Sequence, residues 1–123
     1  MVTKVSPWTV DATVSRLMEI VTKRGLKVFV VVDHSGEARA VGLDLRETKV
    51  VLFGSPAAGT PVMTAAPLMA LDLPLKVLVW ADGDRTKVSY TPPGELANRY
   101  GLSHDLAARF AGIDAITDEL VRT

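Results

Sequence analysis

The chain has 123 residues, which is enough for one domain with a hydrophobic core and too few for two. Hydrophobic residues make up 48% of it and charged residues 23%, the balance of an ordinary globular domain. The formal net charge is zero and the lysines and arginines are scattered. This distribution argues against a nucleic-acid-binding surface, which must neutralise phosphates. We expect a single domain over residues 1–123.

The residue types also limit the cofactors. There is no cysteine, which excludes disulfides, thiolate metal sites, iron–sulfur clusters and a cysteine nucleophile. His34 and His104 are the two histidines, too few for a histidine-rich metal site. We therefore expect no metal and no cofactor, with His34 plus Asp33 or Asp72 as the one open alternative. No signal peptide or membrane span is visible, so we expect a cytoplasmic protein that does not contact membranes.

The first third of the chain predicts a strand, a helix and a second strand. Val2–Val5 favours a short strand, and Thr9 is placed to cap a helix that Gly25 ends. A β-branched run at Lys27–Val32 predicts the second strand. The buried side of the helix is marked by apolar residues at helical spacing, namely Val10, Val14, Leu17, Met18 and Val21.

The middle of the chain predicts short helices between strands. Glu37–Leu43 favours a helix capped by Asp33 or Ser35, and Lys49–Phe53 favours a strand. Thr60 before Pro61 is typical of an N-cap followed by proline at the first helical position. Because a proline inside a helix removes a hydrogen bond, we expect a break at Pro67.

The last part predicts a hairpin followed by helices. Leu75–Ala81 and Thr86–Tyr90 favour strands joined at Asp82-Gly83, the second of them near a sheet edge. One helix should end at Tyr100, before Gly101, and a last one, capped by Ser103, should bend or pack closely at Gly112. Together these elements predict an α+β domain with one mostly antiparallel sheet of four or five strands covered by helices.

Two motifs resemble the domain-of-unknown-function family numbered 302. They are FGSPAAGTP at 53–61 and ALDLPLKVLVW at 70–80. Three shorter matches, VDH at 32–34, AVGL at 40–43 and VSY at 88–90, follow the family in order, as does LANRY at 96–100. The resemblance implies a curved antiparallel sheet similar to the TATA-binding-protein-like fold, and a homodimer. It implies no catalytic residues, and likeness to a DNA-binding fold carries no function by itself.

The segment from Gly54 to Thr60 could hold an anion. It reads G-x-x-x-x-G-T between a strand and a helix, where a phosphate-binding loop has G-x-x-x-x-G-K-[ST]. Thr60 stands in place of the lysine and Pro61 in place of the Ser/Thr, so a nucleotide triphosphatase is excluded. A weaker site for an anion or carboxylate remains possible. The alternative is structural, with Gly54 and Gly59 turning the chain and Thr60 capping the helix.

The remaining candidates are polar groups beside apolar strands. His34 could move protons, with Asp33 as its neighbour, or Asp33 could be a helix cap. Lys76 interrupts an apolar strand and needs a partner such as Asp72, or else its stem packs while its ammonium group reaches water. Tyr90 could place a hydroxyl at a pocket mouth, although such aromatics are more often core.

We therefore expect a dimeric module that binds a small anionic or amphipathic ligand near the Gly54–Thr60 segment. The candidate ligand-binding residues are Asp33, His34, Gly54, Gly59, Thr60, Asp72, Lys76 and Tyr90. One alternative is an enzyme that uses His34 or Lys76 as acid, base or nucleophile, which requires the two to converge on one cavity. Another is an interaction module in which Met63–Leu71 and the apolar strands bury against a second copy.

Overall fold

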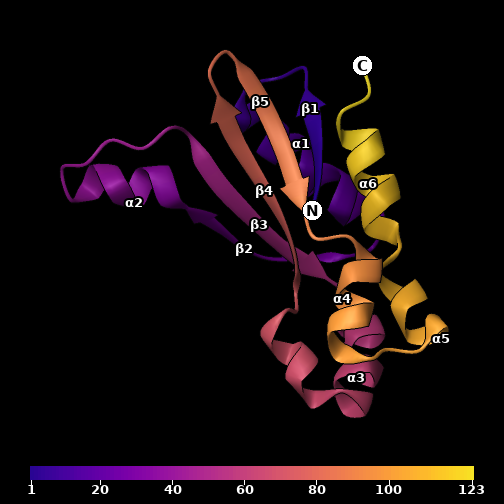
Figure 1. Ribbon diagram of the computed structural model, residues 1–123. Coiled ribbons are helices and arrows are strands. Elements are labelled where there is room, and N and C mark those ends of the chain that lie inside the picture. The colour runs from indigo at the N-terminus through magenta and orange to yellow at the C-terminus, as the bar shows by residue number, and fades with distance from the viewer.

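A single antiparallel sheet organises the protein. The computed structural model describes residues 1–123, and its five strands lie in the order β1-β5-β4-β3-β2, with every neighbouring pair antiparallel. The α+β fold predicted from the sequence is confirmed (Figure 1). The strands are β1 (Val2–Ser6), β2 (Lys27–Asp33), β3 (Thr48–Gly54), β4 (Leu75–Asp82) and β5 (Arg85–Tyr90).

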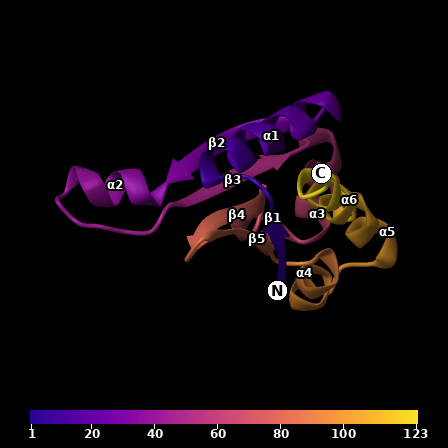
Figure 2. The same ribbon diagram turned by 90° about the horizontal axis from the view of Figure 1, so that it is seen from above.

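Most helices gather on one side of the sheet. In Figure 2, α1 and α6 lie on the same side of the curved sheet, while α2 extends beyond it at the left of the view. None of the helices is both long and apolar enough to cross a membrane. The helices are α1 (Val10–Lys23), α2 (His34–Ala40), α3 (Pro56–Ala65), α4 (Pro93–Tyr100), α5 (His104–Ala107) and α6 (Gly112–Leu120), with 3-10 turns η1 (Pro67–Leu71) and η2 (Ala108–Phe110).

Helix α1 forms where the apolar spacing predicts it. The Thr9 hydroxyl accepts a hydrogen bond from the Ala12 N–H at 3.1 Å and so satisfies one of the free donors of the first turn. Gly25 follows the helix with a φ of 75°, a conformation that glycine adopts without strain. Met18, which the sequence places in the buried stripe, is instead exposed.

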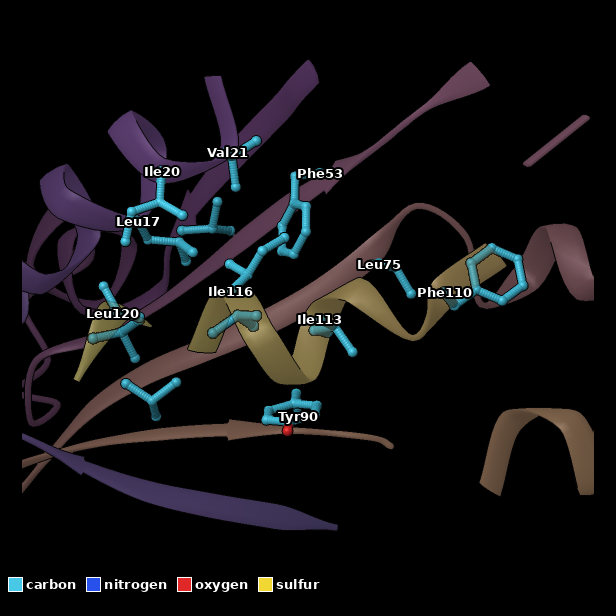
Figure 3. Packing of buried hydrophobic residues seen from close by; sticks show 14 of the residues in the cluster. Leu17, Ile20, Val21, Phe53, Leu75, Tyr90, Phe110, Ile113, Ile116 and Leu120 are labelled. Carbon is cyan, nitrogen blue, oxygen red and sulfur yellow. The ribbon is translucent and has the colours of Figure 1, made fainter. Parts of the chain in front are cut away.

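The core lies between the helices and one face of the sheet. Strand residues that alternate along β3, β4 and β5 point into it, and α6 runs across them (Figure 3). Leu17 and Val21 of α1 and Ile116 and Leu120 of α6 are almost completely buried there. Every helix and 3-10 turn except α2 contributes a residue to this core or packs against it. The other face of the sheet therefore has no helical layer of its own.

Helix α3 begins five residues earlier than predicted. Ser55 is its N-cap, with the hydroxyl accepting from the Ala58 N–H at 3.2 Å, and Pro56 takes the first helical position. The prediction that Thr60 caps this helix is wrong, because Thr60 and Pro61 lie inside it. Gly59 is helical rather than a tight turn. The predicted break at Pro67 is confirmed, since α3 ends at Ala65 and η1 follows.

Two other boundaries can be compared with the prediction. β5 lies near an edge, as predicted, but is not the edge strand itself, because β1 pairs with its outer side over Val2–Ser6. The last helix is interrupted: α5 passes directly into the 3-10 turn η2 at Ala108, and Ala111 separates η2 from α6, just before Gly112. The predicted change of direction at Gly112 therefore coincides with the start of α6, while the change from α5 to η2 lies four residues earlier.

Candidate functional site

A cavity of about 460 Å³ lies at the end of the sheet where β3 finishes and β4 begins. Helix α3 forms one wall and α6 with η2 forms another. Ten of its eighteen lining residues are hydrophobic. Its size falls within the range of small-molecule sites, which are commonly about 300–1,000 Å³. The cavity is large enough for a small organic ligand.

The apolar walls come from elements far apart in the sequence. Phe53, Leu75 and Ile113 belong to β3, β4 and α6, and Figure 3 shows Ile113 and Leu75 between Phe53 and Phe110 of η2. Met63 faces the cavity from α3. Because each element also packs in the core, the walls are fixed by the fold and do not need a ligand to form.

The polar lining residues of α3 are occupied by local hydrogen bonds. The Ser55 hydroxyl caps the helix, and the Thr60 hydroxyl donates to the Pro56 carbonyl at 2.6 Å. Thr60, Gly54 and Gly59 are the three sequence candidates that line the cavity. A Cβ atom added at Gly59 would lie 3.7 Å from Leu73 Cδ1 and 3.9 Å from Met63 Cε, both groups of the cavity wall. A Cβ atom therefore fits at Gly59, whereas a longer side chain there would meet these wall groups.

Arg109 is the single charged residue of the lining. It lies in η2, is exposed, and makes no ion pair or side-chain hydrogen bond within the chain. An arginine guanidinium binds carboxylates and phosphates through several N–H groups at once. The cavity thus combines apolar walls with one unpaired cation.

Asp72 and Lys76 do not line this cavity. Asp72 accepts hydrogen bonds from the Tyr100 hydroxyl and from Arg99 Nη1, the latter at 2.9 Å. The Tyr100 hydrogen bond, followed by the Arg99 contact, holds the pKa of Asp72 below its usual value. Lys76 Nζ is 3.9 Å from Asp72 Oδ1 and its side chain is 44% exposed. Asp72 thus links Lys76 at the start of β4 to Arg99 and Tyr100 of α4, and the ammonium group of Lys76 is partly in solvent.

Asp33 and His34 lie at the opposite end of the sheet. Asp33 caps α2, its carboxylate accepting from the Gly36 N–H at 2.9 Å and from the Ser35 hydroxyl at 2.8 Å. The Gly36 hydrogen bond, then that of Ser35, lowers the pKa of Asp33. His34 is the exposed first residue of α2. The structure therefore does not bring His34 to the cavity, nor does it bring His34 and Lys76 together.

Tyr90 belongs to the core rather than to the cavity mouth. Its ring is buried under α6 and its hydroxyl donates to the Asp114 carboxylate (Figure 3). Lys4 Nζ lies 5.2 Å from the ring centre and donates to Thr117 Oγ1 at 2.7 Å. These contacts connect β5 and β1 to α6, and the Tyr90 hydroxyl is hydrogen-bonded within the chain and lies outside the cavity lining.

A second hollow of about 410 Å³ lies near the β4–β5 hairpin. Three of its twelve lining residues are hydrophobic, and the lining includes Asp11, Glu47, Asp84 and Arg85. It has no group of three or more side chains that could hold a metal ion. Its walls are polar and mixed in charge, so the hollow beside α3 is the better candidate for an amphipathic ligand.

Arg109 is the site residue that the sequence does not reveal. Phe110 and Ile113 reach the cavity wall from η2 and α6, on either side of the break at Ala111. Gly112, where the sequence predicts a bend or close packing, is the one local signal. A lone arginine in a polar-looking stretch carries no signal that separates it from any surface arginine.

The small α+β domain has the same fold as a protein whose crystal structure is known. The structure is similar to the crystal structure of the uncharacterized conserved protein DUF302 from Bacillus stearothermophilus, with a TM-score of 0.81, 20% sequence identity, and coverage of 98% of this chain and 94% of that one. At this identity the likeness concerns the fold. The family model described as "Domain of unknown function DUF302" matches residues 2–120. The chain belongs to the DUF302 family.

Curated relatives carry the name of an ion channel. The chain is 36% identical over 112 residues to the fluoride-specific ion channel FluC 1 of Brucella suis biovar 1, which is 89% of this chain and 44% of that protein. It is also 36% identical over 112 residues to FluC 2 of Brucella melitensis biotype 1, where it spans 42% of that protein. The chain thus spans less than half the length of these relatives. The name of fluoride channel belongs to those longer proteins.

Proposed function

We propose that this protein is a binding module for a small amphipathic anion. The apolar part of the ligand lies between α3 and α6, and its carboxylate or similar group pairs with Arg109. The observation that carries the proposal is the cavity of about 460 Å³, whose walls are apolar and whose lining has a single unpaired cation. Apolar walls with a few placed polar groups are the usual design of a small-molecule site.

The location of the charge favours an anion with an apolar body over a fully polar metabolite. The Ser55 and Thr60 hydroxyls are engaged with the backbone of α3, which leaves few free polar partners for a sugar or nucleotide. A polar ligand would leave unpaired groups against Phe53, Leu75 and Ile113. A monocarboxylate with a hydrocarbon chain needs one ion pair and apolar contact.

An enzyme that uses His34 or Lys76 has weaker support. Neither residue lines the cavity, and they lie at opposite ends of the sheet. Asp33, Asp72 and Tyr90 are each engaged in contacts that stabilise the fold. We also propose that the protein is a homodimer and cytoplasmic. Of the candidate ligand-binding residues, Gly54, Gly59 and Thr60 line the cavity, and Arg109 joins them.

Thermal unfolding against a panel of monocarboxylates of increasing chain length tests the proposal. At a ligand concentration of 100 Kd, binding stabilises the folded state by about 2.7 kcal/mol. For a domain of this size that corresponds to a rise in Tm of about 10 °C. We expect the rise to grow with chain length until the cavity is full. Equal and negligible shifts across the panel would contradict the proposal.

Two variants and one control locate the binding. Arg109→Gln removes the cation and should weaken binding about tenfold or more, since a hydrogen bond to a charged group contributes about 1.5–3 kcal/mol. Gly59→Leu places a side chain among Leu73 and Met63 and should abolish binding. Arg85→Gln is the control, because Arg85 is an exposed arginine that lines the second hollow. If Arg85→Gln lost binding and the two cavity variants kept it, the ligand would bind in the second hollow instead.

A further inference from the structure

All three phenylalanines of the chain line the cavity beside α3. Phe29 comes from β2, Phe53 from β3 and Phe110 from η2, which are separate elements of the fold. Phe53 and Phe110 are also buried members of the core (Figure 3), whereas Phe29 is 42% exposed. No tyrosine or tryptophan lines this cavity. The phenyl groups of the protein therefore gather around one space.

Phe29 is the phenylalanine that the core does not require. It is neither a core residue nor one of those that pack against the core. Among the leucines, isoleucines, methionines and phenylalanines of the cavity lining, it alone is exposed. Phe53 and Phe110 fill space inside the protein, and the stability of the fold explains them. Phe29 instead leaves apolar ring surface in water at the cavity, and a bound ligand would cover that surface.

An irregularity in the pairing of β2 gives Phe29 its position. β2 is an edge strand, and its pairing with β3 passes from Val28 opposite Phe53 directly to Val30 opposite the next residue of β3. Phe29 is thus the extra residue of a β-bulge. Because of it, Val28 and Val31 both pack against the core, although regular alternation would place them on opposite faces. Bulges are common beside binding sites, where they redirect a side chain.

Lys27 contacts the Phe29 ring from one side. Its ammonium nitrogen lies 5.0 Å from the ring centre, within the range of a cation–π interaction. Lys27 makes no ion pair within the chain. The contact favours one orientation of the ring and occupies one of its faces. The other face and the ring edges are left for a ligand.

We propose that the cavity binds a carboxylate that carries an aromatic ring, with the ring against Phe29 and the carboxylate on Arg109. The inference rests on the amphipathic-anion site of the proposed function and narrows its ligand to aryl carboxylates. Aromatic rings pack edge-to-face or offset against one another with a gain beyond the area that they bury. Met63, which also lines the cavity, has a thioether that makes favourable contacts with ring edges.

The two exposed side chains suit the two parts of such a ligand. Phe29 and Arg109 are the large exposed side chains of the lining, so both lie where the cavity of about 460 Å³ meets solvent. A carboxylate at Arg109 keeps part of its hydration, which lowers the desolvation cost of the ion pair. A rigid ring also loses fewer rotatable bonds on binding than an alkyl chain with the same number of carbons.

Calorimetric titration of two acids with equal carbon counts tests the inference. The acids are 4-phenylbutanoate and 4-cyclohexylbutanoate, which differ only in the aromaticity of the ring. We expect the phenyl acid to bind about two- to tenfold more tightly to the natural protein, because the apolar burial is matched and only one ring interacts through its π system. Equal affinities, or tighter binding of the cyclohexyl acid, would overturn the inference and leave the anion site standing.

Phe29→Leu assigns the preference to one residue. The variant should still bind both acids, with affinities that differ by less than about twofold, since it keeps an apolar side chain and removes the ring. Its Tm without ligand should stay close to that of the natural protein, because Phe29 lies outside the core. Val30→Leu is the matched control at an exposed neighbouring position that does not line the cavity, and it should keep the full preference.

Two outcomes separate this inference from the proposed function. A phenyl preference that survives Phe29→Leu, or that Val30→Leu removes equally, overturns the role of Phe29 while the anion site remains. If neither acid binds to the natural protein, the proposed function fails and this inference fails with it.

Methyl NMR of the methionines gives a second readout that does not depend on affinity. The chain has four methionines, and Met63 is the one that lines the cavity. A bound aromatic ring should shift the Met63 methyl resonance through its ring current, and the saturated ring should shift it much less. Met18, exposed on α1, is the internal control and should not move. A Met63 shift of equal size with both acids, or a shift at Met18 alone, would contradict the inference.

Discussion

At one end of the sheet apolar side chains surround a cavity, whereas at the other end they are exposed on residues 34–47, a projecting segment that we call the arm. At the cavity end, α3 and α6 lie over the apolar strand ends. At the arm end, Val41, Leu43 and Leu45 are exposed and lie outside the core. Apolar residues thus have different surroundings at the two ends, depending on whether helices cover them.

The largest difference between the two regions should be in stability. Phe53 is fully buried beside the cavity, and Phe53→Ala should cost about 3 kcal/mol or more of unfolding free energy, because it removes a core ring. Leu43→Ala on the arm should change it by less than about 0.5 kcal/mol in the monomer. Urea denaturation at low protein concentration measures both. Comparable losses would mean that the arm packs in solution against its own chain.

The anchor of the arm should have an intermediate effect. Ser35→Ala leaves the Thr48 N–H without its acceptor and should cost about 1–2 kcal/mol. Hydrogen exchange should quicken at Thr48 and along α2, while the amides of α6 keep their protection. Thr60→Ala is the matched control at the cavity end, since its hydroxyl bonds only to the Pro56 carbonyl. Faster exchange throughout the core would show that the arm is not a separate unit.

A smaller effect should appear in the dependence of stability on pH. The pKa of Asp72 is lowered from an ordinary value of 3.8 by the Tyr100 hydroxyl and by Arg99. The charged form therefore stabilises the fold above that value, and its contribution is lost as the pH falls through the lower, folded-state pKa. Asp72→Asn should flatten the acid limb of the Tm curve. Asp44→Asn, on the arm, should leave that limb as it is, and an equal flattening would contradict the assignment.

The smallest effects should distinguish two glycines. Gly42 on the arm has a φ of 78°, so Gly42→Ala should cost about 1 kcal/mol through backbone strain. Gly112 on the cavity wall has room for a Cβ atom and an ordinary φ, so Gly112→Ala should be neutral or stabilise by up to about 0.5 kcal/mol. Chemical denaturation of both variants checks the order. The reverse order would mean that Gly112 has a positive φ or a close neighbour in solution.

Periodicity predicts elements well here, but their ends depend on competing caps. Helix α1 can be predicted from the spacing of its apolar residues and from its N-cap Thr9, because both features lie within the helix or directly before it. For α3 the sequence analysis predicts a start at Thr60-Pro61, whereas the structure begins the helix at Ser55-Pro56 and accommodates Pro61 inside it. The choice depends on how α3 packs, which local spacing does not encode.

The candidate site shows a similar limit. Gly54, Gly59 and Thr60 stand out as a motif, and they do line the cavity. Arg109 joins them only because the chain bends between η2 and α6, about fifty residues later in the sequence. Asp33, His34 and Lys76 are noticeable as polar residues next to apolar strands, yet none of them lines the cavity. Asp33 ends β2, His34 begins α2 and Lys76 lies on β4.

Calorimetric titration of a medium-chain monocarboxylate into the natural protein measures whether the cavity binds an amphipathic anion. We expect one ligand per chain and a negative heat-capacity change, the mark of apolar burial, with binding weakened in Arg109→Gln and unchanged in Arg85→Gln. Saturable binding that Arg109→Gln leaves unchanged, or no binding by any member of the series, would show that the cavity is not a site of this kind.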